Sequence, residues 1–149
     1  MQFDSSAFVS DPELVQAFER QSSAIPCDLD RVLFRQGDVP AGLYILHEGA
    51  ATLSARSTGR KFAICLQTTA GSLLGLPSLF GRQPSPLTAT VKSGAALSFI
   101  NGEDFFALIR SDPALHLKLT HTLAAETEFS RMAILDQLCV EAEFAVAAL

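Results

Sequence analysis

Tryptophan is absent from the sequence, tyrosine occurs once and cysteine occurs three times in 149 residues. The cysteines Cys27, Cys65 and Cys139 are far apart, form no Cys-x-x-Cys pair and lack the spacing of metal ligands. This pattern argues against a disulfide framework and favours reduced thiols in a cytoplasmic protein. The 11 phenylalanines must therefore supply most of the aromatic volume of the core.

Positive charge is also scarce. The chain has 11 Lys and Arg residues against 16 Asp and Glu residues, which gives a net charge of −5. Residues 119–149 contain a single basic residue, Arg131, among the acidic residues Glu126, Glu128, Asp136, Glu141 and Glu143. Because DNA is recognised through positive surfaces, we predict that this chain does not bind DNA directly.

Long hydrophobic runs are missing as well. No apolar run reaches the roughly 18 residues that a membrane-spanning helix needs. The N-terminal sequence Met-Gln-Phe-Asp lacks the basic start and the apolar block of a signal peptide. We therefore expect a cytoplasmic protein with no membrane partner.

The motifs of common enzymes are not found. The sequence has no Gly-x-Ser-x-Gly nucleophile turn and no phosphate-binding Gly-x-x-x-x-Gly-Lys-Ser/Thr loop. His47 falls in a predicted strand, and His116 and His121 are five residues apart, which does not place them on one helical face. We predict no catalytic residue, no metal site and no cofactor, and therefore no enzyme.

Most of the chain is predicted to form short strands between two helical regions. Asp11, Pro12 and Glu13 predict a helix start, with an apolar face that continues to about Arg20. Short apolar or alternating stretches separated by turns then predict strands, as in a sandwich or barrel. These stretches are residues 32–34, 43–46, 51–55, 62–66, 87–91 and 95–100.

Helices return after the last predicted strand. Residues 101–104 are predicted to open a short helix, and Pro113 is predicted to start another. Neither Gly nor Pro occurs after Pro113, so the last helix would be about 50 Å long if it reached the end. We predict an α+β protein with a first domain of residues 1–111 and a C-terminal helix of residues 112–149.

Four sequence segments occur in an order that resembles a known family. They are LFRQGD at residues 33–38, LYILHEG at 43–49, GSLLG at 71–75 and LTATV at 87–91. Together they resemble the cyclic-nucleotide-binding superfamily, and the order of elements resembles the sensor half of CRP/FNR-type bacterial transcription regulators. The resemblance implies a β-roll of the jelly-roll type with flanking helices and a long C-terminal helix.

The resemblance also locates a ligand loop whose polar residues have been replaced. In nucleotide-binding members, a Glu after the loop's glycine binds the ribose and an Arg binds the cyclic phosphate. Here Leu76 follows Gly75 and Leu87 precedes Thr88. The resemblance therefore implies a degenerate cassette that does not bind cAMP or cGMP. Its residues are Gly75, Leu76, Pro77, Ser78, Leu87, Thr88 and Ala89. Three interpretations remain open: a different or apolar ligand, a site filled by the protein's own side chains, or a vestigial site.

An apolar seam is predicted along the C-terminal helix. Apolar residues recur there at three- and four-residue steps, which is typical of a coiled-coil interface. The central seam residues are Met132, Leu135, Cys139, Ala142 and Val146. A helix of this length exceeds what the small barrel can cover, so we expect a homodimer. The alternative is a helix packed against its own barrel.

Two functions follow from these features. The first is a regulatory sensor domain without catalytic activity, whose small ligand is not identified by the sequence. The alternative is a ligand-independent dimeric module that binds another protein.

Overall fold

The computed structural model describes residues 11–56 and 63–124. The predicted seam residues 132–146 lie outside these ranges, so the dimer remains a prediction. The domain boundary between residues 111 and 112 also remains a prediction. In chain order, the first elements are α1 (Pro12–Glu19), β1 (Ser23–Ile25), β2 (Arg31–Phe34), β3 (Gly42–Glu48), β4 (Ala51–Arg56), β5 (Ala63–Thr68) and β6 (Leu73–Leu74). They are followed by α2 (Leu76–Gly81), β7 (Thr88–Val91), β8 (Ala96–Asn101) and α3 (Gly102–Ser111), and by helical residues 113–124.

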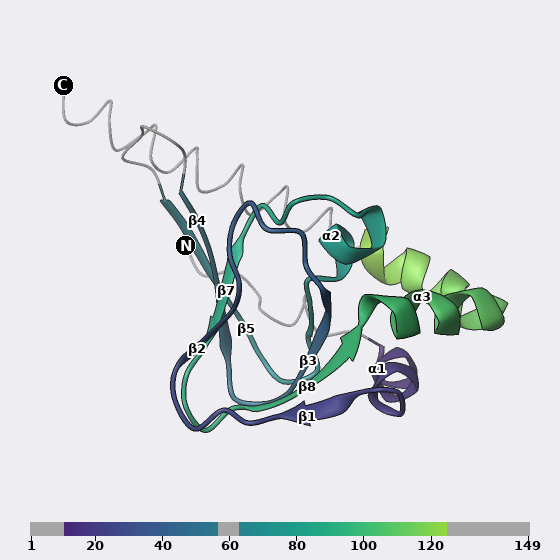
Figure 1. Ribbon diagram of the computed structural model, residues 1–149, viewed down its shortest axis with the longest axis horizontal. Coiled ribbons are helices and arrows are strands. Elements are labelled where there is room, and N and C mark those ends of the chain that lie inside the picture. Colours follow the sequence, from purple (N-terminus) through teal and green to yellow (C-terminus); the bar gives the residue numbers. More distant parts are fainter. Residues whose placement is uncertain (1–10, 57–62, 125–149) are drawn as a thin grey trace.

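The strands form two antiparallel four-stranded sheets, with the orders β1-β8-β3-β6 and β2-β7-β4-β5 (Figure 1). Figure 1 also shows α1, α2 and α3 together on the side of β3 and β8. This arrangement confirms the predicted α+β fold, a β-roll with flanking helices. The short strands β1 and β6 were not predicted, because two or three residues are too few to show a hydrophobic period.

Two apolar cores lie on opposite faces of the sheet that contains β3 and β8. Alternation along β3 directs Tyr44 and Leu46 into the roll, and directs Leu43 and Ile45 toward the helices. We call the first set the interior core; its buried members are Cys27, Leu33, Phe34, Leu46, Ala51, Leu53, Leu74, Ala89, Val91 and Leu97. We call the second set the helix-side core; its buried members are Leu14, Phe18, Leu43, Ile45, Leu73, Leu76, Leu79, Ile100, Phe105, Ile109, Leu115 and Leu119.

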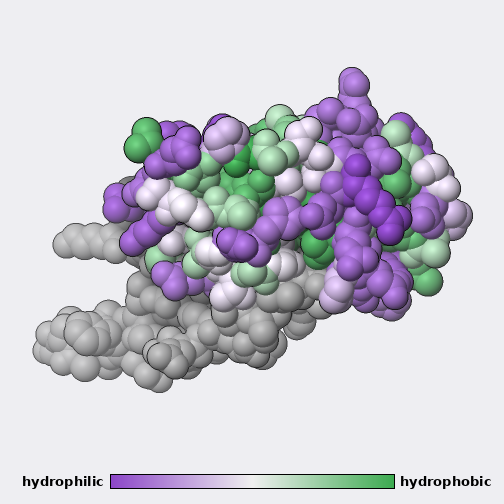
Figure 2. Space-filling model, turned by 90° about the horizontal axis from the view of Figure 1, so that it is seen from below, coloured by the Kyte–Doolittle hydropathy of each residue, from purple (hydrophilic) through white to green (hydrophobic). Residues whose placement is uncertain are grey.

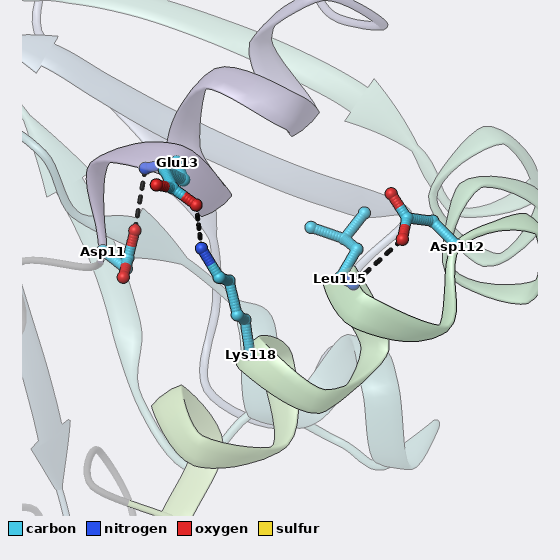
Figure 3. Close-up of polar contacts among 5 residues, drawn as sticks. All are labelled: Asp11, Glu13, Asp112, Leu115 and Lys118. Atoms are coloured by element: carbon cyan, nitrogen blue, oxygen red, sulfur yellow. Dashed lines mark hydrogen bonds and ion pairs between the residues drawn. The ribbon is translucent and has the colours of Figure 1, made fainter.

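The predicted helix start at Asp11 is confirmed. The Glu13 backbone N–H donates to Asp11 Oδ1 at 2.8 Å, and Pro12 occupies the first turn (Figure 3). Glu13 also forms an ion pair with Lys118, and the Leu115 N–H donates to Asp112 Oδ1 at 3.1 Å. The ion pair joins α1 to the helical residues 113–124, and the hydrogen bond to Asp112 caps the start of that segment, which begins where the sequence predicted a new helix.

The surface of the helical part is mostly hydrophilic in the view of Figure 2, and hydrophobic areas there are small. This agrees with two cores that are enclosed between layers. Among the residues that the structure describes, no helix is long and apolar enough to cross a membrane.

Candidate ligand site

The cassette begins at Gly75 with a left-handed backbone. The φ angle of Gly75 is 88°, and this residue caps α2, whose first turn contains Pro77. A Cβ at Gly75 would stand 3.2 Å from the ring of Phe34. Glycine is therefore required here both by the turn and by the close approach of an aromatic ring from β2. The helix α2 begins with the residue that directly follows Gly75.

Leu76 occupies the position at which the family's ribose-binding Glu is expected. Its side chain is 0% exposed and belongs to the helix-side core. This residue therefore packs among the helices, and it offers no hydrogen-bonding group to the roll interior. Ser78 and Leu79 of the same short helix are also buried.

Leu87 lies directly before β7, at the position where the family's phosphate-binding Arg is expected. Its half-buried side chain packs against the interior core. The preceding Ser85 is buried; its hydroxyl donates to the Leu87 carbonyl at 2.7 Å and accepts from the Leu87 N–H at 3.2 Å. The side chain at position 87 therefore supplies no cation that could pair with an anion.

Backbone hydrogen bonds tie the end of the cassette to the turn that follows β2. The Gly37 N–H donates to the Ser85 carbonyl at 2.8 Å, and the Ser85 N–H donates to the Asp38 carbonyl at 2.7 Å. The Gln36 N–H donates to Thr88 Oγ1 at 2.8 Å. The Thr88 hydroxyl therefore already serves as an acceptor within the protein, while Ala89 beside it is fully buried in the interior core.

The side chain of Gln36 connects the same turn to β4 through two further hydrogen bonds. Its Nε2 donates to the Arg56 carbonyl, and its Oε1 accepts from the Arg56 N–H, both at 3.0 Å. Sequence reasoning did not identify Gln36, because its partners are 20 and 52 residues away along the chain. A local motif carries no signal for contacts of that separation.

The basic residues near the cassette do not replace the missing Arg. The guanidinium of Arg82 lies 4.7 Å from the ring centre of Phe106, which is a cation–π contact with α3. Lys92 is exposed beyond the end of β7, and its carbonyl accepts from the buried Cys27 thiol at 3.4 Å. The Arg82 guanidinium therefore packs against α3, and the Lys92 side chain is exposed to solvent.

Three aromatic side chains line the interior beside the cassette. The ring centres of Phe34 and Tyr44 are 6.3 Å apart, and those of Tyr44 and Phe99 are 4.9 Å apart. Burial raises the pKa of the Tyr44 phenol, and the nearby positive charge of Arg31 offsets part of this effect. These residues come from three different strands, so no single sequence motif contains all of them.

His47 and His116 have different neighbours. His47 Nε2 is 2.7 Å from the Ser98 hydroxyl, and the ring of His116 is 6.1 Å from that of Phe80. Within residues 11–56 and 63–124, no group of three or more His, Cys, Asp or Glu side chains is arranged to hold a metal ion.

Comparisons with known proteins agree with this geometry. The sequence model of the family "Cyclic nucleotide-binding domain" matches residues 28–112. No curated protein gives a significant match.

Among solved structures, the Thermus thermophilus Catabolite Activator Protein has a TM-score of 0.70 and 25% identity, and the match covers 87% of this chain and 60% of that one. The N-terminal domain of a transcriptional regulator from Streptomyces coelicolor A3(2) has a TM-score of 0.61 and 23% identity, covering 80% and 86%. The c-di-GMP responsive global regulator CLP of Xanthomonas campestris has a TM-score of 0.65 and 18% identity, covering 91% and 65%.

The chain thus spans about three fifths of the length of the Thermus protein. The family match covers more than half of the sequence, and it includes all four segments noted above. The chain therefore belongs to the cyclic nucleotide-binding domain family and resembles the sensor half of CRP/FNR-type transcription regulators.

Proposed function

We propose that this chain is a non-catalytic regulatory sensor domain of the CRP/FNR type that does not bind cAMP or cGMP. The observation that carries the proposal is the placement of Leu76 and Leu87 in the two apolar cores. A cyclic phosphate taken out of water needs a cation and fixed donors to offset its desolvation. These two positions offer neither a cation nor an acceptor for the ribose.

The proposed setting is a cytoplasmic homodimer. Support for the dimer comes from the apolar seam in the sequence, and the solved relatives supply the regulatory context. The absence of the motifs of common enzymes supports a role in signalling rather than in chemistry.

Neither cAMP nor cGMP is expected to bind measurably at physiological concentration. Titration calorimetry of the purified chain with each nucleotide checks this, with the Thermus protein's counterpart domain titrated in parallel as a comparison. Micromolar affinity for cAMP would contradict the proposal. It would mean that residues other than Leu76 and Leu87 bind the phosphate and the ribose.

A second candidate is a ligand-independent dimeric protein-interaction module. The hydrogen bonds from the Gln36 turn to Ser85 and Thr88 favour it, because they hold the cassette in place without a ligand. A thermal-stability screen against small molecules separates the two functions, since a ligand that binds only the folded state raises the unfolding midpoint. A screen without a single stabilising molecule would favour the interaction module.

The chain alone is expected not to bind DNA specifically. The reason is the excess of acidic residues in residues 119–149, because their negative charge repels the phosphates of DNA. A gel-shift assay at low and moderate salt checks this. Weak binding that disappears as salt increases is compatible with the expectation, whereas sequence-specific binding that survives moderate salt contradicts it.

A further inference from the structure

The sheet β2-β7-β4-β5 ends in the six-residue strand β5, and no strand in the described part of the chain pairs with its second side. We call this side the open edge of β5. On its other side, β5 pairs with β4 in one uninterrupted register, from Ala51–Thr68 to Arg56–Ala63. The β5 sequence AICLQT contains no charged residue, no proline and no glycine. A regular, uncharged edge of this kind is a template for another strand.

The other three edge strands are protected. β1 has three residues and β6 has two, so neither offers a ladder of useful length. β2 has four residues, begins with the exposed Arg31, and changes register between Val32 and Phe34. Short length, charge and bulges are the features by which natural sheets prevent contact between edges. β5 has none of them.

The backbone of β5 presents hydrogen-bonding groups to the open edge at regular intervals. On β4, the N–H and the carbonyl of Arg56 both bond to the Gln36 side chain, so they point away from β5. Arg56 and Ala63 therefore form a non-hydrogen-bonded pair, and such pairs alternate with bonded pairs in an antiparallel ladder. By this alternation, Ala63, Cys65 and Gln67 direct their N–H and carbonyl groups to the open edge.

The side chains next to the open edge are accessible and uncharged. Cys65 and Gln67 are exposed. They lie opposite Ser54 and Thr52, on the face of the sheet that points away from the interior core, because Leu53 between these two residues belongs to that core. An added strand would continue this face without burying a charge of β5.

The charge around β5 has a single sign. Residues 49–102 contain five basic residues and no acidic residue, so all 16 acidic residues lie in residues 1–48 and 103–149. In the ladder of β4 and β5, the charged residue is the exposed Arg56, which pairs with Ala63. A second copy that paired through β5 would bring two positive segments together, which is unfavourable. A negatively charged strand would be attracted.

We propose that the open edge of β5 binds an extended acidic segment of a partner protein, which adds a strand to the sheet β2-β7-β4-β5. Main-chain hydrogen bonds to Cys65 and Gln67 hold the added strand in register, and an acidic side chain pairs with Arg56. This surface lies outside the cassette. The inference therefore goes beyond the proposed function and does not depend on whether the roll has a small ligand.

The test uses a fluorescein-labelled peptide in which Val and Thr alternate in the centre and two Glu residues stand at each end. One control peptide has Lys in place of Glu. The other is the acidic peptide with N-methyl groups on its central amides, which removes the N–H donors of the added strand. Fluorescence anisotropy with the whole chain measures binding. The acidic peptide is expected to bind at least about tenfold more tightly than either control, because each control lacks one of the two interactions.

Variants of the whole chain locate the added strand on β5. Cys65→Pro removes an N–H that faces the open edge and is not part of the β4 ladder, so the roll should fold. The acidic peptide should bind it at least about tenfold more weakly. Cys65→Ser is the matched control, because it keeps this N–H, and it should bind as the wild type does. Arg56→Gln should weaken binding about threefold, as expected for an exposed charge pair. Arg110→Gln, which removes an exposed charge from the last turn of α3, should leave binding unchanged.

Three results of the binding assay would overturn the inference: no binding of the acidic peptide, equal binding of either control peptide, or unchanged binding to a folded Cys65→Pro. Light scattering supplies a fourth. If Cys65→Pro is a folded monomer while Cys65→Ser is a dimer, a second copy occupies the open edge and the proposed partner is wrong. If Cys65→Pro does not fold, the N-methylated peptide decides the question, because it requires no change in the protein.

Discussion

The Gly42→Ala variant is expected to be less stable than the wild type by about 3 kcal/mol or more. A Cβ at position 42 would lie 2.2 Å from the Ile100 carbonyl oxygen and 2.5 Å from Cζ of Phe99. Rotation of Phe99 relieves the second collision, but the first involves the backbone of the neighbouring strand. The methyl group therefore forces β3 and β8 apart.

The position of Gly42 makes this separation costly. It begins β3 and pairs with Asn101, so the collision lies where β8 ends and α3 begins. The Gly102 N–H donates to the Ala41 carbonyl at 2.9 Å immediately beside this pair. Both apolar cores depend on this junction, because β3 contributes side chains to each of them.

Equilibrium denaturation followed by circular dichroism measures the effect. Gly81→Ala is the matched control, because a Cβ there would meet only the Gln83 side chain at 3.7 Å, an ordinary contact. We expect Gly81→Ala to stay within about 0.5 kcal/mol of the wild type. A loss smaller than about 1 kcal/mol in Gly42→Ala would contradict the close approach of the two strands at this point.

The sequence predicted the fold because its turns are encoded locally. The segments at residues 33–38 and 71–75 fix sharp changes of direction within a few residues, so their order could be read without knowing any distant contact. The Asp11 cap and the break before Pro113 are local signals of the same kind. The strands β1 and β6 were missed because they are too short to carry a pattern.

The candidate site was predicted only in part, for the opposite reason. The motif alone marks Leu76 and Leu87 as the positions of the expected polar residues, but it does not show that they pack against different cores. The contacts of the three aromatic side chains beside the cassette and the Gln36 bonds join strands that are far apart in sequence. Contacts of this kind depend on sheet register, which no single segment specifies.

The Leu135→Glu variant is expected to be a folded monomer, whereas the wild type is expected to be a dimer at tens of micromolar. Such a dimer corresponds to roughly −7 kcal/mol of association free energy. Residues 113–124 already show apolar surface that the roll does not cover. Leu115 and Leu119 are buried against the roll, but Leu117 is 62% exposed. The roll therefore covers one side of this helix and leaves apolar surface on another.

The sequence after residue 124 extends this apolar surface at coiled-coil spacing, with Leu135 near its middle. In a parallel pair related by a two-fold axis, each seam residue would meet its own copy. A carboxylate at position 135 would then have to lose water or bind a proton, and either is costly enough to separate the protomers. The roll has its own cores, so it should remain folded.

Light scattering reports the mass of the variant, and circular dichroism reports whether it is folded. Gln137→Glu is the control, because it adds the same charge at a position that is not part of the predicted apolar seam. It should remain dimeric. A wild-type monomer at tens of micromolar, or a dimeric Leu135→Glu, would place the interface elsewhere. Complete unfolding of Leu135→Glu would instead mean that this helix packs into the core of its own roll, because only then does the charge enter the folded monomer.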